Sequence, residues 1–206
     1  EFTYGGKVIK IPHTLLITAM TVMPDVKTSI TMDVKRPGDA VVVVGLTRNE
    51  LGGGEYLALL GKAGGVIPKV DRALSKPVLT AVAGLTAAGL VSAAHDCSEG
   101  GLGVSLAEMA FSGGYGMEID ANAIPREGVT TLERALFSES QSRIVLTVPK
   151  GNLHEVHERL AGVPHAVIGS VVAAPVLSIN GLGSKVATDL ALLKESWQAP
   201  LSVMEG

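Results

Sequence analysis

The chain has little of what marks several other classes of protein. Cys97 is its single cysteine, so no disulfide can form within the chain, and a reducing compartment such as the cytoplasm is expected. No run of about 18 apolar residues is free of breakers, which excludes a membrane-spanning helix. No charged and apolar leader opens the chain, so secretion is not expected. Seventeen basic residues against 20 acidic ones argue against a nucleic-acid partner.

The chain is rich in apolar residues, which make up 47 % of its 206 positions, so it can bury a substantial core. Residues 40–45 are apolar without alternation, and they predict a central strand that is covered on both faces. A helix is expected from Ser75, its cap, to Gly89, with Pro77 in the first turn. Further strands are predicted over 14–22, 90–95, 115–120, 143–148, 165–172 and 175–179, and helices over 129–136, 152–161 and 188–197. Residues 97–112 are expected to contain a glycine loop and a helix. The alternation of strands and helices predicts a layered α/β sandwich rather than a bundle or a barrel.

A change of composition predicts a boundary near residue 33. Residues 25–39 are polar and end in the turn signal Pro37-Gly38-Asp39. We therefore expect residues 1–33 to form an extended appendage and residues 34–206 to form the α/β domain. Because the chain opens on Glu1 rather than on methionine, it is expected to be a fragment of a longer protein.

The stretch from His95 to Leu102 is the most informative, because it joins a predicted strand to a predicted helix. Gly100 and Gly101 let the backbone turn tightly, and N–H groups at a helix start favour an anion such as phosphate. Asp96, at the carboxyl end of the strand, is a natural Mg²⁺ ligand beside a phosphate, and Ser98 could hydrogen-bond a phosphate oxygen. The alternative is an ordinary helix start with Ser98 as its cap.

Two other segments could line a site. Gly52-Gly53-Gly54 also lies between a predicted strand and a predicted helix, but it lacks the Lys-Ser/Thr pair of a P-loop and could be only a flexible turn. The polar residues 137–143 precede an apolar strand, so they could line a cleft. Their alternative is a solvated turn in which Arg143 pairs with a carboxylate.

Two other candidates for chemistry have simpler explanations. His154 and His157 are close enough on a predicted helix to share a metal, but no third ligand has a suitable spacing, and a solvated helix face is the better interpretation. Cys97 has no evident histidine partner, and the neighbouring Asp96 would raise its pKa, which indicates a small buried thiol rather than a nucleophile.

Four segments, in order, carry a family resemblance. The residues 95–109 (HDCSEGGLGVSLAEM) closely resemble the HD-x-S-[DE]-GGL-x-x-x-LAEM segment of phosphoribosylformylglycinamidine synthases. Residues 11–19 (IPHTLLITA) are similar to the family's IPPTLLI strand, and residues 45–56 (GLTRNELGGGEY) to its G-x-T-x-x-ELGGSEY loop. Residues 137–143 (FSESQSR) resemble its FSES-x-SR motif. Gly54 stands where the family often has serine, and Glu99 where aspartate is common.

The resemblance implies a place in a larger enzyme. The synthetase of this family has two tandem halves, each with a barrel-forming domain followed by an α/β domain of the aminoimidazole-ribonucleotide-synthetase type. This chain resembles the last α/β domain, a layered sandwich of a mixed sheet with helices, preceded by about 33 residues from the second barrel-forming domain. The catalytic histidine lies in a part of the enzyme that this chain does not match, so no catalytic residue is assigned and the chain alone is expected to be inactive.

The resemblance also implies an activity, cofactors and partners. The family converts formylglycinamide ribonucleotide to its amidine with ATP, Mg²⁺ and ammonia, and a glutaminase domain or subunit supplies the ammonia. Asp96 then coordinates Mg²⁺, and Ser98, Gly100 and Gly101 contact nucleotide phosphate. The segment Glu139-Ser140-Gln141 matches a substrate-binding segment of the first half, so that role transfers only through pseudo-symmetry. The other synthetase domains and the glutaminase are the expected partners, without nucleic acid or membrane.

Two alternatives stay open at this stage. The chain could come from another enzyme of the same superfamily, such as aminoimidazole ribonucleotide synthetase, selenophosphate synthetase or a hydrogenase-maturation protein, although the ELGGGEY loop favours the amidine synthase. It could also be a non-catalytic module for nucleotide binding or assembly.

Overall fold

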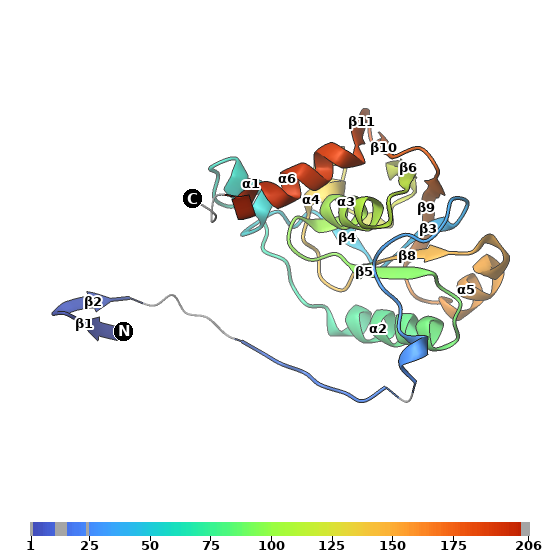
Figure 1. Cartoon of the computed structure of the whole chain (residues 1–206), viewed down its shortest axis with the longest axis horizontal. Coiled ribbons are helices and arrows are strands. Elements are labelled where there is room, and N and C mark those ends of the chain that lie inside the picture. Colours follow the sequence, from blue (N-terminus) through green and yellow to red (C-terminus); the bar gives the residue numbers. More distant parts are fainter. Residues whose placement is uncertain (1, 11–15, 24, 203–206) are drawn as a thin grey trace.

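A mixed seven-stranded sheet organises the protein, whose computed structural model describes residues 2–10, 16–23 and 25–202 (Figure 1). The strands lie in the order β11-β10-β6-β9-β3-β8-β5. The pair β6 and β10 is parallel, whereas the other neighbouring pairs are antiparallel. The strands are β3 (Ala40–Val44), β5 (Ala93–Asp96), β6 (Gly116–Asp120), β8 (Ile144–Val148), β9 (His165–Val172), β10 (Val176–Gly181) and β11 (Ser184–Asp189).

Helices cover both faces of this sheet, which confirms the predicted layered α/β sandwich. One face carries α3 (Gly101–Gly113), α4 (Leu132–Phe137) and α6 (Leu190–Ser202), and the other carries α2 (Arg72–Ala87) and α5 (Leu153–Arg159). Figure 1 shows the same division, with α2 and α5 on one side of the strands and α3, α4 and α6 on the other. Each layer buries its own apolar cluster against the sheet.

Strand β3 shows why a run of valines without alternation marks the middle of such a sandwich. Val41 and Val43 belong to the cluster under α3, while Val42 and Val44 belong to the cluster under α2. All four are 0 % exposed, because neighbours in a strand point to opposite faces and both faces are covered. Its neighbours β9 and β8 pair with it on both sides, so its predicted central position is confirmed.

Most of the other predicted strands and helices are present, but some begin or end at other residues than predicted. The strands expected at 115–120, 143–148, 165–172 and 175–179 correspond to β6, β8, β9 and β10. The expected helix from Ser75 begins earlier, because Asp71 is the cap and its Oδ1 accepts the Ala73 N–H at 3.0 Å. Pro77 therefore lies inside α2 rather than in its first turn, and the helix ends before Gly89, which has a φ of +66°.

Several small elements escaped prediction. Strands β4 (Thr47–Arg48) and β7 (Arg126–Glu127) form a separate parallel pair, and β11 is an exposed edge strand without an apolar pattern. By contrast, the helix predicted after the first glycines is confirmed as α1 (Glu55–Leu59), which is five residues long. Three short 3₁₀ turns complete the fold at η1 (Val26–Thr28), η2 (Ala121–Ala123) and η3 (Lys150–Asn152).

The N-terminal segment differs from its prediction. A small hairpin of β1 (Phe2–Tyr4) and β2 (Lys7–Ile9) lies away from the sheet in Figure 1. The strand predicted over 14–22 is wrong for residues 16–22, which have no regular structure, while residues 14 and 15 lie outside the described residues. A strand needs a neighbour to complete its hydrogen bonds, and in the described part of the chain none pairs with this segment. Packing against the sandwich begins at Ile30 and Val34; the boundary near residue 33 stays a prediction.

Candidate functional site

The turn between β5 and α3 depends on two glycines. Gly100 and Gly101 have φ of +76° and +68°, a region that residues with a side chain rarely adopt. A Cβ at Gly100 would lie 2.3 Å from a methyl carbon of Val104, and one at Gly101 would lie 2.5 Å from the carbonyl oxygen of Ser138. Both glycines are buried, so the start of α3 is pressed against the residues around Ser138.

Asp96 ends β5 with its carboxylate exposed and held in place. The hydroxyl of Ser98 donates to its Oδ2, and Nδ1 of His95 lies 3.4 Å from its Oδ1. The Ser98 hydrogen bond, more than any other contact, lowers the pKa of Asp96. The carboxylate is therefore ionised at neutral pH, and its side chain is 69 % exposed, which leaves it open to a cation.

The imidazole of His95 lies between two carboxylates. Its Nε2 is 2.8 Å from Oε2 of Glu108, and the other oxygen of that carboxylate accepts the Trp197 indole N–H at 3.2 Å. The half-exposed Trp197 ring also packs on Phe111 at 5.6 Å between ring centroids. A chain of contacts therefore runs from α6 through Glu108 on α3 to the residue before Asp96, and the sequence pattern did not reveal it.

Glu139 brings the two glycine segments together. Its Oε1 accepts the Gly100 N–H at 3.0 Å and the Glu55 N–H at 2.8 Å. These N–H groups lie at the starts of α3 and α1. Gly101 in turn donates its N–H to the carbonyl oxygen of Ser98 at 3.0 Å. The N–H groups predicted to hold phosphate at Gly100 and Gly101 are thus both engaged within the protein.

Arg143 organises the segment that carries Glu139. Its side chain is buried, and it donates to the carbonyl oxygens of Ser138 and Ser140 and, at 3.0 Å, to the hydroxyl of Thr47. Burial lowers the pKa of its guanidinium. The alternative from the sequence, an arginine paired to a carboxylate in a solvated turn, is therefore wrong. Instead, the buried arginine donates hydrogen bonds to the carbonyl oxygens on either side of Glu139 and so holds the segment that carries this residue.

The two residues after Glu139 face different surroundings. The hydroxyl of Ser140 is buried, accepts the Arg48 N–H at 2.9 Å and donates to the Arg48 carbonyl oxygen at 3.2 Å. Gln141 is exposed, and its Nε2 donates to the carbonyl oxygen of Glu139 at 3.4 Å. Of these two side chains, that of Gln141 can meet a ligand without breaking a structural contact.

Cys97 and the histidines have the simpler roles. Cys97 is buried, and burial is the main cause that raises the pKa of its thiol, as expected for an unreactive cysteine. His157 pairs with His165, at 2.8 Å between Nδ1 and Nε2, rather than with His154, which faces Glu158. In the part of the chain that the structure describes, no three His, Cys, Asp or Glu side chains are grouped so that they could hold a metal ion.

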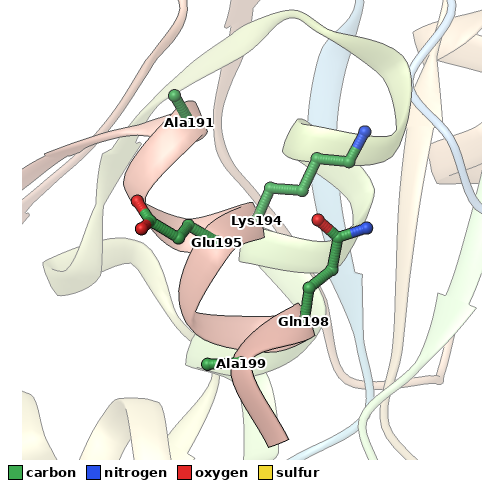
Figure 2. Close-up of a pocket in the computed structure, with 5 residues that line it drawn as sticks. All are labelled: Ala191, Lys194, Glu195, Gln198 and Ala199. Atoms are coloured by element: carbon green, nitrogen blue, oxygen red, sulfur yellow. The ribbon is translucent and has the colours of Figure 1, made fainter. Parts of the chain in front are cut away.

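An open surface hollow of about 490 Å³ lies apart from these loops, along the exposed side of α6. Five residues of that one helix line it, and Figure 2 shows Lys194 and Gln198 pointing to one side and Glu195 to the other. It includes none of the residues expected to bind a ligand. Among the described helices, none is long and apolar enough to cross a membrane.

Comparison with known proteins identifies relatives of the whole domain. The family model described as AIR synthase related protein, C-terminal domain, matches residues 36–181. The chain is 36 % identical over 195 residues to the phosphoribosylformylglycinamidine synthase subunit PurL of Alkaliphilus metalliredigens, covering 93 % of this chain and 26 % of that protein. The chain spans about a quarter of the length of the curated PurL subunits it matches.

Solved structures show the same fold. The crystal structure of phosphoribosylformylglycinamidine synthase II from Thermotoga maritima superposes with a TM-score of 0.69 at 21 % identity, covering 82 % of this chain and 28 % of that one. The T. maritima PurL complexed with FGAR superposes with a TM-score of 0.72 at 21 % identity, covering 82 % of this chain and 30 % of that one. Other structures of that protein are complexes with ATP and with ADP, and one is of PurLQS. Because the family match covers more than half of the sequence, the chain belongs to the family of AIR synthase related proteins, as their C-terminal domain.

Proposed function

We propose that residues 34–206 are the last α/β domain of a phosphoribosylformylglycinamidine synthase, and that residues 1–33 are the extended tail of the preceding barrel-forming domain and the linker. The parent enzyme amidates formylglycinamide ribonucleotide with ATP, a step of purine synthesis in the cytoplasm. Three observations support the proposal. The four motifs occur in the family's order, the match to PurL covers 93 % of this chain, and it covers 26 % of that relative.

In this proposal the domain contributes one side of a magnesium–nucleotide pocket. The observation that carries it is the exposed and ionised Asp96 at the end of β5, directly before the glycine turn into α3. A hard carboxylate oxygen suits Mg²⁺, which neutralises phosphate charge when it is bound. Since the described residues hold no cluster of three ligating side chains, phosphate oxygens, waters and other domains must complete the coordination.

Ser98 can serve the same pocket through a change of partner. Its hydroxyl donates to Asp96 in this structure, and a hydroxyl has one proton to donate. If a cation takes over the Asp96 carboxylate, the hydroxyl is released and can turn toward a phosphate oxygen. Metal and phosphate are therefore expected to bind together, with Asp96 and Ser98 exchanging their mutual hydrogen bond for the two ligands.

The proposed substrate contacts are fewer than the motif implies. The hydroxyl of Ser140 donates its one proton to the Arg48 carbonyl oxygen and accepts the Arg48 N–H. The carboxylate of Glu139 accepts two backbone N–H groups. Among the three side chains of this motif, Gln141 is the exposed one, and we keep its contact with the substrate as a prediction.

The remaining domains and a glutaminase that supplies ammonia are the proposed partners. Leu59, Ile67 and Val70 are between 65 % and 84 % exposed on α1 and on the segment that follows it. Such an apolar group is expected where another domain packs. Because the matched motifs lack the family's catalytic histidine and the partner half of the cleft, the chain alone should not convert formylglycinamide ribonucleotide. Phosphate release above the blank would contradict the domain assignment.

The decisive experiment changes Asp96 in the full-length parent. Asp96→Asn keeps the shape of the side chain but removes the charge that binds Mg²⁺, so nucleotide affinity should fall about ten- to a hundredfold. Bound nucleotide is measured by chromatography after denaturation of the purified protein. Glu99→Gln is the matched control, since it removes one exposed charge from the same turn. A parent in which Asp96→Asn retains as much nucleotide as the control contradicts the proposal.

A further inference from the structure

The carboxylate of Glu139 occupies the point where the two glycine segments meet. One oxygen, Oε1, accepts hydrogen bonds from Glu55 at 2.8 Å and from Gly100 at 3.0 Å. These donors lie in different segments, 84 and 39 residues away from Glu139 in sequence. A carboxylate that accepts two backbone N–H groups is a charge-assisted contact, stronger than a neutral one.

Gly54 is the residue that leaves room for this carboxylate. Its φ of −92° and ψ of 168° are extended values that any residue adopts, so its backbone does not require glycine. A Cβ at this position would lie 2.8 Å from both Cδ and Oε1 of Glu139. That contact is too short, and it is the side chain of Glu139 that would have to move. The absence of a side chain at residue 54 and the placement of Glu139 are thus one feature.

The negative charges around the junction disfavour the binding of an external anion. Glu55 carries one of the two N–H groups, Glu99 precedes Gly100, which carries the other, and Asp96 precedes the turn. An incoming phosphate would meet these carboxylates as well as that of Glu139, whose oxygen already takes the hydrogen bonds that the phosphate would accept. Repulsion between like charges and competition for the same N–H donors both oppose the binding of phosphate at the junction.

We propose that the Glu139 carboxylate is an internal anion that closes the junction of the two glycine segments, and that an external phosphate must displace it to reach the Gly100 N–H. This inference deepens the proposed function and rests on it for the identity of the natural ligand, a nucleotide phosphate. It assigns Asp96 and Ser98 to the side of the turn from which that phosphate enters. In this proposal, Glu139 controls the access of phosphate to the Gly100 N–H, and Gly54 leaves the room that the Glu139 carboxylate needs.

The test follows the backbone amides of Gly100 and Glu55 by ¹H–¹⁵N NMR in the present chain, with inorganic phosphate as the probe. In the unmodified protein neither resonance should shift with phosphate beyond the general effect of salt. In Glu139→Ala both should shift along a saturating curve, with a dissociation constant at least about tenfold lower than in the unmodified protein. Glu99→Ala is the matched control, because it removes one negative charge beside the same amides without removing their acceptor.

Each outcome decides the matter. A response in Glu139→Ala that is absent from Glu99→Ala supports the internal anion. Equal responses in the two variants, or a phosphate response in the unmodified protein as strong as in Glu139→Ala, overturn it. If Glu139→Ala does not fold, Gly54→Ser replaces it. The new Cβ should displace the carboxylate and move both resonances before phosphate is added, and unchanged resonances overturn the inference.

The readout separates this inference from the proposed function. It needs inorganic phosphate and two assigned amides, whereas the proposed function is tested by nucleotide retained through Asp96 in the parent. A silent Glu139→Ala together with lost nucleotide in Asp96→Asn refutes the internal anion alone. A responsive Glu139→Ala together with unchanged nucleotide in Asp96→Asn refutes the proposed function and leaves the carboxylate as an anion that closes the junction.

Discussion

Gly101 is enclosed by backbone atoms of another segment, and replacing it by alanine tests how closely the start of α3 is packed. The added Cβ would meet the carbonyl oxygens of Ser138 at 2.5 Å and of Leu136 at 2.8 Å. Both are backbone atoms, which cannot rotate away as the end of a side chain can. The residue also has a φ of +68°, so alanine is strained there whatever the space.

Gly128 provides a control with the same backbone and no contact. Its φ is +66°, and a Cβ there would have nothing within 4 Å. Gly128→Ala should therefore lower the free energy of unfolding by about 1–2 kcal/mol, the cost of a left-handed conformation for a residue with a Cβ. Gly101→Ala carries that cost and about 1–3 kcal/mol more for overpacking, so it should lose about 2–5 kcal/mol.

Urea denaturation followed by far-ultraviolet circular dichroism measures both variants against the unmodified chain. The difference between the two substitutions isolates the steric contact, because their backbone strain is alike. We expect Gly101→Ala to be the less stable by at least about 1 kcal/mol. Equal losses would show that the turn can widen without cost, and the close packing of α3 against the residues around Ser138 would then be refuted.

Three further predictions concern neighbouring residues. Arg143→Lys should lower the free energy of unfolding by about 2–5 kcal/mol in the same assay, because one ammonium group cannot reach three separated acceptors. The exposed Arg159→Lys should cost less than about 1 kcal/mol, and equal losses would contradict the role of the buried arginine. Ser98→Ala should raise the pKa of Asp96 toward its usual value near 3.8, as followed by ¹³C NMR of the carboxyl group. Because the pKa of Asp96 is lowered in the folded protein, its hydrogen bond with Ser98 stabilises the fold above about pH 4, and this stabilisation is lost as the pH falls through the folded pKa. An Asp96 pKa that is the same in Ser98→Ala as in the unmodified protein would contradict the role of this hydrogen bond. Cys97 should react with iodoacetamide far more slowly in the native protein than in urea, since burial raises its pKa, and rapid native labelling would contradict this.

Sequence reasoning succeeded where the signal is local. The burial of β3 follows from five successive apolar residues, and the turn before α3 follows from paired glycines after a strand. It failed at the edges, because β11 has an exposed pattern that apolar periodicity does not detect. It also placed the start of α2 at Ser75, since a serine before an apolar run looks like a cap even when an aspartate four residues earlier is the real one.

The candidate site divides in the same way. The place of Asp96 at the end of a strand was predicted from the pattern, whereas the hydrogen bond that Ser98 donates to it was not. Arg143 was identified as part of a polar cluster, but its burial and its three oxygen acceptors could not be anticipated. One of these acceptors, the hydroxyl of Thr47, lies 96 residues away in sequence.

The sequence by itself determined the alternation of strands and helices over most of the sandwich, the apolar run of the central strand and the glycines of the two turns. These follow from steric limits on the backbone and from the burial of apolar side chains, which act within a few residues. Only the tertiary structure decided which group fills the junction between the turns. Gly54, Gly100 and Glu139 come from three distant segments, and no local pattern specifies that a carboxylate from one will accept the N–H groups of the other two.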